Sequence, residues 1–136
     1  MADLTITGSQ VVPATASLRQ MLSAAATAIG DVVYESSTGV ATKGDNSTAA
    51  KAAAKGIAVS AADAASQPIV VQTGGNITLG AGAAPVQGTV YAVSANSGKI
   101  CPLTDVGSGK YVTILGVGAA SNVLKMHIHA SGVAVP

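Results

Sequence analysis

The feature that most constrains this chain is an internal repeat, in which a short phrase led by glycine occurs twice. Gly30–Tyr34 reads GDVVY and Gly88–Tyr91 reads GTVY, and each phrase is followed by a further glycine and then by an aspartate. Gly56 and Gly116 continue the repeat toward the C-terminus. Two copies are too few for a solenoid, which needs three or more units to bury a continuous core. The repeat therefore predicts one small domain built from two related halves.

The repeat also indicates which part of the chain is unique. Leu4–Pro13 resembles Ile77–Pro85, and Ile69–Gly75 resembles Met126–Gly132, but residues 14–29 have no counterpart in the second copy. We therefore predict an N-terminal arm, residues 1–29, and a single β domain, residues 30–136. Its halves are expected to span about residues 30–75 and 76–132.

Short runs rich in β-branched residues and separated by turn residues dominate the rest of the chain, which predicts strands. Turn signals such as Ser37–Gly39 and Gly107–Gly109 separate several of these runs. Such punctuation predicts a mainly β fold, a small β-barrel or β-sandwich. The expected strands are 32–34, 56–60, 68–72, 76–79, 89–93, 111–117 and 123–129.

Two segments depart from the β pattern. Ser47–Gly56 combines a capping hydroxyl, an alanine-rich body and a terminal glycine, which predicts one short helix near residues 47–55. Ala14–Ile29 is ambiguous, because Leu18, Met21 and Leu22 share a helical face while the same residues could equally lie extended along a neighbour. Periodicity alone does not decide between the two forms.

Composition excludes several classes of function. Only 10% of the residues are charged and the formal net charge is +1, which argues against nucleic acid or an anionic membrane surface as a partner. There is no Trp or Phe, so the core has to be built from smaller aliphatic side chains. A surface so poor in charge favours association, and we expect a homo-oligomer. The single cysteine, Cys101, is expected to be a buried thiol, with an intermolecular link as the alternative.

The sequence offers no catalytic cluster, and we expect no enzyme activity, no cofactor and no metal. His127 and His129 could chelate a metal from one side of a strand, but further ligands are missing nearby, so an outward polar face is the preferred interpretation. Tyr34, Tyr91 and Tyr111 are expected to be core or interface anchors, with sugar stacking as the alternative.

Three stretches taken in order, Ala28–Tyr34, Ala54–Val59 and Gln67–Val71, make the chain resemble the tailed-phage capsid decoration (cement) proteins. The later stretch Gly88–Gly116 is similar to members of that group as well, so the resemblance covers roughly residues 28–132. It implies a β-rich virion protein that binds the outer surface of an expanded capsid, often as a trimer, and stabilises contacts between major capsid subunits. It also favours an extended arm.

These considerations give a set of expectations about partners. The partner is the major capsid protein, and the location is the outer capsid surface after synthesis in the host cytoplasm, with no membrane contact. The alternative is a carbohydrate-binding or host-adhesion module of a phage head or tail fibre. The residues expected to contact the capsid or a neighbouring subunit are Leu4, Ile6, Val11, Val12, Leu18, Met21 and Leu22.

Overall fold

A computed structural model describes residues 3–13, 17–120 and 122–136, and within them the chain is mainly β. The strands of the first half are β1 (Leu18–Leu22), β2 (Val32–Glu35), β3 (Ala41–Lys43), β4 (Ala54–Ala58) and β5 (Pro68–Gln72). Those of the second half are β6 (Gly75–Thr78), β7 (Val90–Val93), β8 (Ile100–Pro102), β9 (Tyr111–Ala119) and β10 (Val123–Ala134). One short helix, α1 (Ala49–Ala52), and two 3-10 turns, η1 (Gly8–Gln10) and η2 (Leu103–Asp105), complete the fold.

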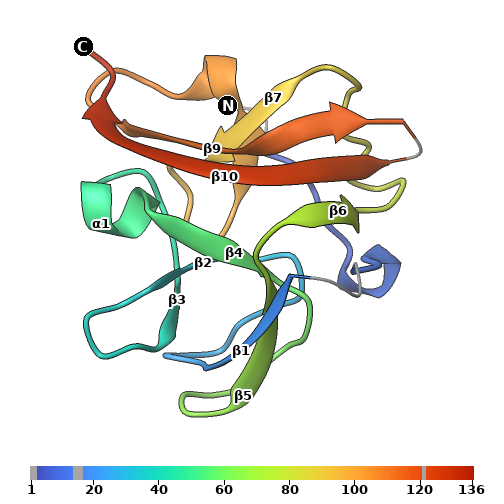
Figure 1. Ribbon diagram of the computed structural model, residues 1–136, viewed down its shortest axis with the longest axis vertical. Coiled ribbons are helices and arrows are strands. Elements are labelled where there is room, and N and C mark those ends of the chain that lie inside the picture. Colours follow the sequence, from blue (N-terminus) through green and yellow to red (C-terminus); the bar gives the residue numbers. More distant parts are fainter. Residues whose placement is uncertain (1–2, 14–16, 121) are drawn as a thin grey trace.

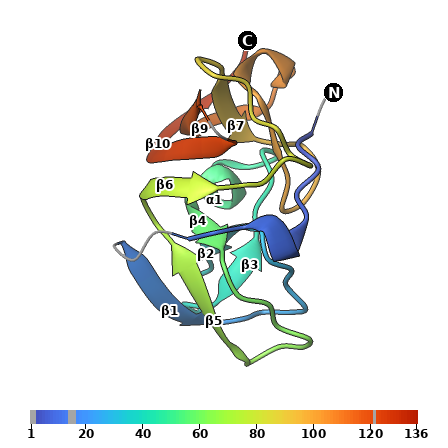
Figure 2. The same cartoon turned by 90° about the vertical axis from the view of Figure 1, so that its right-hand side faces the viewer.

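The strands form two antiparallel sheets with one common topology. The first sheet has the order β1-β5-β4-β2-β3 and the second has the order β6-β10-β9-β7-β8. The number of each strand in the second sheet is therefore that of its counterpart in the first sheet plus five. The sheets are packed like a sandwich of two halves and are not closed into a barrel (Figures 1 and 2). The predicted fold class, mainly β with two related halves, is confirmed.

Matching hydrogen bonds align the two halves residue by residue. The Gly30 amide donates to the carbonyl of Ala58, and the Gly88 amide donates to the carbonyl of Gly118. Further along, Gly56 pairs with Val33 just as Gly116 pairs with Tyr91, and a bulge follows each pair. The repeat of the glycines is therefore a repeat of structure.

The predicted equivalence of Tyr34 and Tyr91 is wrong by one residue. Since Val33 and Tyr91 each lie opposite the repeated glycine, the structural counterpart of Tyr34 is Ala92. Successive side chains in a strand point to opposite faces, so the two tyrosines lie on opposite faces of their sheets.

The predicted boundary of the arm also needs correction. β1 occupies the same position in the first sheet as β6 does in the second, so the first half begins at Leu18 and residues 18–22 do have a counterpart. The predicted alignment of Ile69–Gly75 with Met126–Gly132 is shifted as well. Val71 lies opposite Ala58 as Leu124 lies opposite Gly118, so Val71 is equivalent to Leu124. The segment that precedes the repeated strands is therefore the one before β1. Residues 14–16 lie outside the described part of the chain. Residues 18–22 are extended, the form that the resemblance favours, but as a strand of the first sheet and not as a separate arm.

The N-terminal segment, residues 3–13, folds back onto the second sheet. The Leu4 amide donates to the carbonyl of Ile100 at 2.8 Å, and Val12 exchanges two backbone hydrogen bonds with Thr78 of β6. In the first half, the Ala24 amide donates the corresponding hydrogen bond to the carbonyl of Ala41 at 2.9 Å. Ala41 is the residue equivalent to Ile100. The N-terminal segment thus supplies to the second half what residues 23–29 supply to the first.

Two hydrophobic clusters hold the fold together. The larger contains Tyr91 and aliphatic residues of both sheets, and Leu4, Ile6 and Val11 pack against its side. The smaller contains Met21 and lies on the other face of the first sheet. Every buried aliphatic group in these clusters contributes through the apolar area it removes from water, about 25 cal/mol per Å².

The predicted helix is confirmed and helps to join the halves. Thr48 caps α1 by accepting a hydrogen bond from the Lys51 amide at 3.2 Å. Just before it, the fully buried Asn46 binds the second half three times. Its backbone N–H and side-chain amide donate to the carbonyls of Ser94 and Val93, and its own carbonyl accepts from the Tyr111 amide.

Candidate functional site

The first candidate site is the outer edge of β1, which we call the β1 edge and define as residues 18–22. β1 ends the strand order of the first sheet, and no other described strand pairs with its outer side. Ser17 accepts a hydrogen bond from the Thr73 amide at 2.8 Å, and the Ser23 amide donates to Gln67 at 2.9 Å. Both bonds face β5.

In an antiparallel pair the hydrogen-bonded residues alternate along each strand. Because Ser17 and Ser23 face β5, so do Arg19 and Met21, and the backbone groups of Leu18, Gln20 and Leu22 point away from it. Such a row of outward N–H and C=O groups is a template on which another chain can add a strand.

The side chains of the β1 edge divide between the two faces. Met21 is only 5% exposed and belongs to the smaller core, and on that same face Arg19 forms an ion pair with Glu35. Leu18 and Leu22, on the opposite face, are 43% and 49% exposed. Within the described residues, the edge therefore combines backbone groups that have no partner with two exposed apolar side chains.

The residues expected to contact a partner are not brought together as one surface. Leu4, Ile6 and Val11 are partly buried against the larger core, and Met21 lies in the smaller one. Val12 is 59% exposed, although its backbone is paired with β6. Of the seven, only Val12, Leu18 and Leu22 offer an exposed side chain in the described structure.

The three tyrosines have different environments. Tyr91 is fully buried in the larger core, and its hydroxyl accepts a hydrogen bond from the Val86 amide at 2.8 Å. Tyr111 is half-buried at the start of β9. Tyr34 is half-buried as well and lines a hollow of about 350 Å³.

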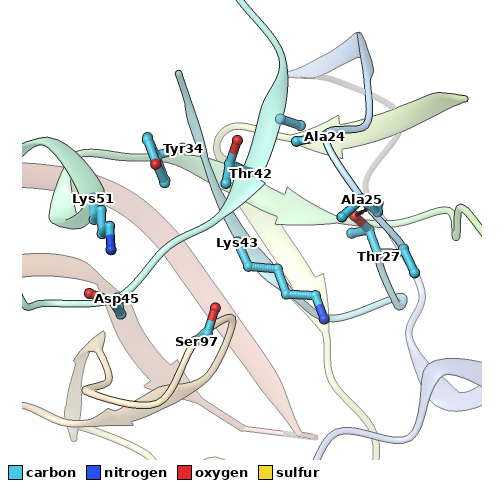
Figure 3. A pocket seen from close by; sticks show the side chains of 11 residues that line it. Ala24, Ala25, Thr27, Tyr34, Thr42, Lys43, Asp45, Lys51 and Ser97 are labelled. Carbon is cyan, nitrogen blue, oxygen red and sulfur yellow. Dashed lines mark hydrogen bonds between the residues drawn. The ribbon is translucent and has the colours of Figure 1, made fainter. Parts of the chain in front are cut away.

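This hollow, which we call the Tyr34 hollow, is the second candidate site (Figure 3). In that view Tyr34 and Lys51 lie at one end and Thr27 at the other, with the Lys43 side chain extended between them. It lies between the halves, since the turn after β7 contributes a serine. The lining residues are Ala24, Ala25, Ala26, Thr27, Tyr34, Ala41, Thr42, Lys43, Asp45, Lys51 and Ser97.

Positive and negative side chains lie close together in and beside the Tyr34 hollow. The Lys43 ammonium lies 3.7 Å from the buried carboxylate of Asp31. Burial raises the pKa of Asp45, but hydrogen bonds from the Ser47 hydroxyl and amide, helped by the charge of Lys51, hold that pKa below the ordinary 3.8. The Asp45 carboxylate is therefore anionic at neutral pH and lies near the charge of Lys51.

The remaining candidates for chemistry are separate from both sites. His127 and His129 are exposed on β10, and no group of three or more metal-ligating side chains exists among the described residues. Cys101 is fully buried and free, as expected. Burial, with a smaller effect of the Asp3 and Asp105 charges, raises the pKa of its thiol to about 11. Within the described part of the chain, no helix has the length and apolarity needed to cross a membrane.

Sequence reasoning missed the polar lining of the Tyr34 hollow. Thr42 lies directly opposite Tyr34 in the β2–β3 hairpin, and the turn signal at Ser37–Gly39 could have indicated this pairing. Lys51 and Ser97 carry no such signal, because α1 and the turn after β7 reach the hollow only through the tertiary packing of the chain.

Comparison of the chain with models of protein families, with curated proteins and with solved structures finds no match.

Proposed function

We propose that this chain is a structural virion protein that binds the outer surface of an expanded tailed-phage capsid and stabilises the contacts between major capsid subunits. The resemblance of residues 28–132 to capsid decoration proteins motivates this proposal. It also implies that the working unit is a homo-oligomer, with a trimer favoured, and that the partner is the major capsid protein.

The observation that carries the proposal is the β1 edge. Leu18, Gln20 and Leu22 present backbone groups that make no hydrogen bond to any other described residue, and the two leucines add apolar area beside them. A segment of a capsid subunit that adds to this edge would gain backbone hydrogen bonds and would bury both leucines. Each contact is modest, but an oligomer that binds several subunits gains affinity through multivalency.

Low charge supports the same proposal. With 10% charged residues, the chain has few ionic groups to desolvate when a large part of its surface is covered by other protein.

The direct test is binding to capsids before and after expansion. Purified chain is mixed with unexpanded heads and with expanded heads that lack it, and the bound fraction is measured by co-sedimentation. We expect saturable binding to expanded heads only, and extra density on the outer surface in electron micrographs of the decorated particles. Absence of binding to expanded heads, or equal binding to both forms, would contradict the proposal.

A further inference from the structure

The Tyr34 hollow has features of a ligand site that capsid binding does not use. Its volume of about 350 Å³ lies at the small end of the range for ligand pockets, roughly 300–1,000 Å³. β2, β3 and α1 of the first half line it together with residues 24–27 and with Ser97, which a turn of the second half contributes.

An aromatic ring stands at one end of the hollow. Tyr34 lies beside the backbone of Gly44, where an added Cβ atom would come within 3.7 Å of the ring carbon Cδ1. This distance is an ordinary van der Waals contact, so the ring packs close to the Gly44 backbone; it is half-buried and still reaches the hollow. Such a partly exposed ring offers an apolar face with a polar hydroxyl at its tip.

Several polar groups around the ring are free of protein partners. Among the described residues, the side-chain hydroxyls of Tyr34, Thr42 and Ser97 make no hydrogen bond to the protein. Lys51 has no carboxylate within 4.0 Å of its ammonium group in that part of the chain. The second hollow, of about 360 Å³, is lined mainly by alanines and has no aromatic residue.

The balance of charge indicates the class of ligand. Lys43 faces Asp31, and Lys51 lies near enough to Asp45 to lower the pKa of that carboxyl. Asp31 is not part of the lining, but it offsets the charge of Lys43, and Asp45 offsets that of Lys51, so little net charge remains with which to hold a phosphate or a carboxylate. A ligand rich in hydroxyl groups can instead donate to Asp45 and accept from Lys51.

We propose that the Tyr34 hollow binds a neutral saccharide, with the ring of Tyr34 against the apolar face of one sugar ring. The hydroxyls of Thr42 and Ser97, the Lys51 ammonium and the Asp45 carboxylate bond the sugar hydroxyls. This activity does not depend on capsid binding, because the hollow is complete within one chain.

The test uses the isotopically labelled full chain and observes its backbone amide signals by NMR. The probes are methyl glycosides of neutral hexoses and short neutral oligosaccharides at millimolar concentrations, with glucuronate and inorganic phosphate as acidic probes. We expect at least one neutral probe to cause saturable shifts at Tyr34, Thr42 and Ser97. The acidic probes are expected to cause none.

Three variants test the assignment of the contacts. Tyr34→Ala should abolish the saturable shifts, whereas Thr42→Val and Ser97→Ala should each weaken binding by about threefold to tenfold, the effect of one hydrogen bond. Thr104→Val, in the exposed part of η2, is the matched control and should bind as the unmodified chain does. Ser97 is exposed in a turn, so its variant keeps the test valid if the Tyr34 variant does not fold.

The outcomes that overturn the proposal are distinct. No saturable shift with any neutral probe, a preference for glucuronate or phosphate, or unchanged binding in both hydroxyl variants would each refute it. None of these results would affect the capsid proposal, which depends on the β1 edge.

Discussion

Replacement of the repeated bulge glycines by alanine tests the equivalence of the two halves. A Cβ atom added at Gly56 would lie 2.1 Å from the carbonyl oxygen of Gln72, and one added at Gly116 would lie 2.1 Å from that of Lys125. Ordinary contact begins near 3.4 Å, so the neighbouring strand has to move by roughly 1 Å or more. Both obstacles are backbone atoms, which cannot rotate away as a side chain can.

The expected loss of stability follows from this displacement. Overpacking costs about 1–3 kcal/mol, and one weakened ladder hydrogen bond adds about 1 kcal/mol, so each variant should lose about 2–4 kcal/mol of its unfolding free energy. Urea unfolding followed by circular dichroism measures it. Gly107→Ala is the control, because no atom lies within 4 Å of its added Cβ. If Gly56→Ala and Gly116→Ala unfolded at the same urea concentration as Gly107→Ala, the reasoning would be refuted.

Two further predictions concern titratable groups. Cys101, buried and with a thiol pKa of about 11, should not react with a thiol reagent at neutral pH until the chain unfolds; rapid reaction of the folded protein would contradict its burial. Asp45 has a folded pKa below its ordinary value of 3.8, so its contribution to stability is complete above that pH and is lost as the pH falls through the folded pKa. Unfolding free energies measured against pH should therefore fall less steeply below pH 3.8 in Asp45→Asn than in the unmodified chain, and parallel curves would show that the carboxylate contributes nothing.

Most of the strands could be predicted from the sequence because their side chains carry the pattern themselves. On β10, Leu124 and Met126 are buried while Lys125 and His127 are exposed, as the alternation of apolar and polar residues requires. The capping signal at the start of Ser47–Gly56 likewise located α1, although the residue that caps the helix is Thr48 and not Ser47.

The errors arose where pairing between distant strands decides the structure. β1 reads LRQML and its counterpart β6 reads GNIT, so their equivalence has no trace in the sequence. The three-residue strands β3 and β8 were missed because each is defined by its hairpin partner. Tyr34 and Tyr91 were paired through an assumed gap, which the shared register of Gly30 and Gly88 does not allow.

The same limit applies to the candidate sites. Leu18 and Leu22 were named as contact residues together with Leu4, Ile6, Val11 and Met21, because apolar side chains in an arm look alike. The structure separates them by burial, since the second group packs on the two cores. A deletion of the whole arm would therefore unfold the protein, and only surface substitutions can test partner binding.

The most direct test of the central claim is the occupancy of expanded capsids by β1 edge variants. Leu18→Lys with Leu22→Lys removes the apolar area, and Gln20→Pro removes an outward N–H that makes no bond to β5. The control is Val133→Lys on β10, where the side chain is 63% exposed. We predict that each edge variant folds but binds about tenfold or more weakly, while the control binds normally. Undiminished occupancy by both edge variants would contradict the account.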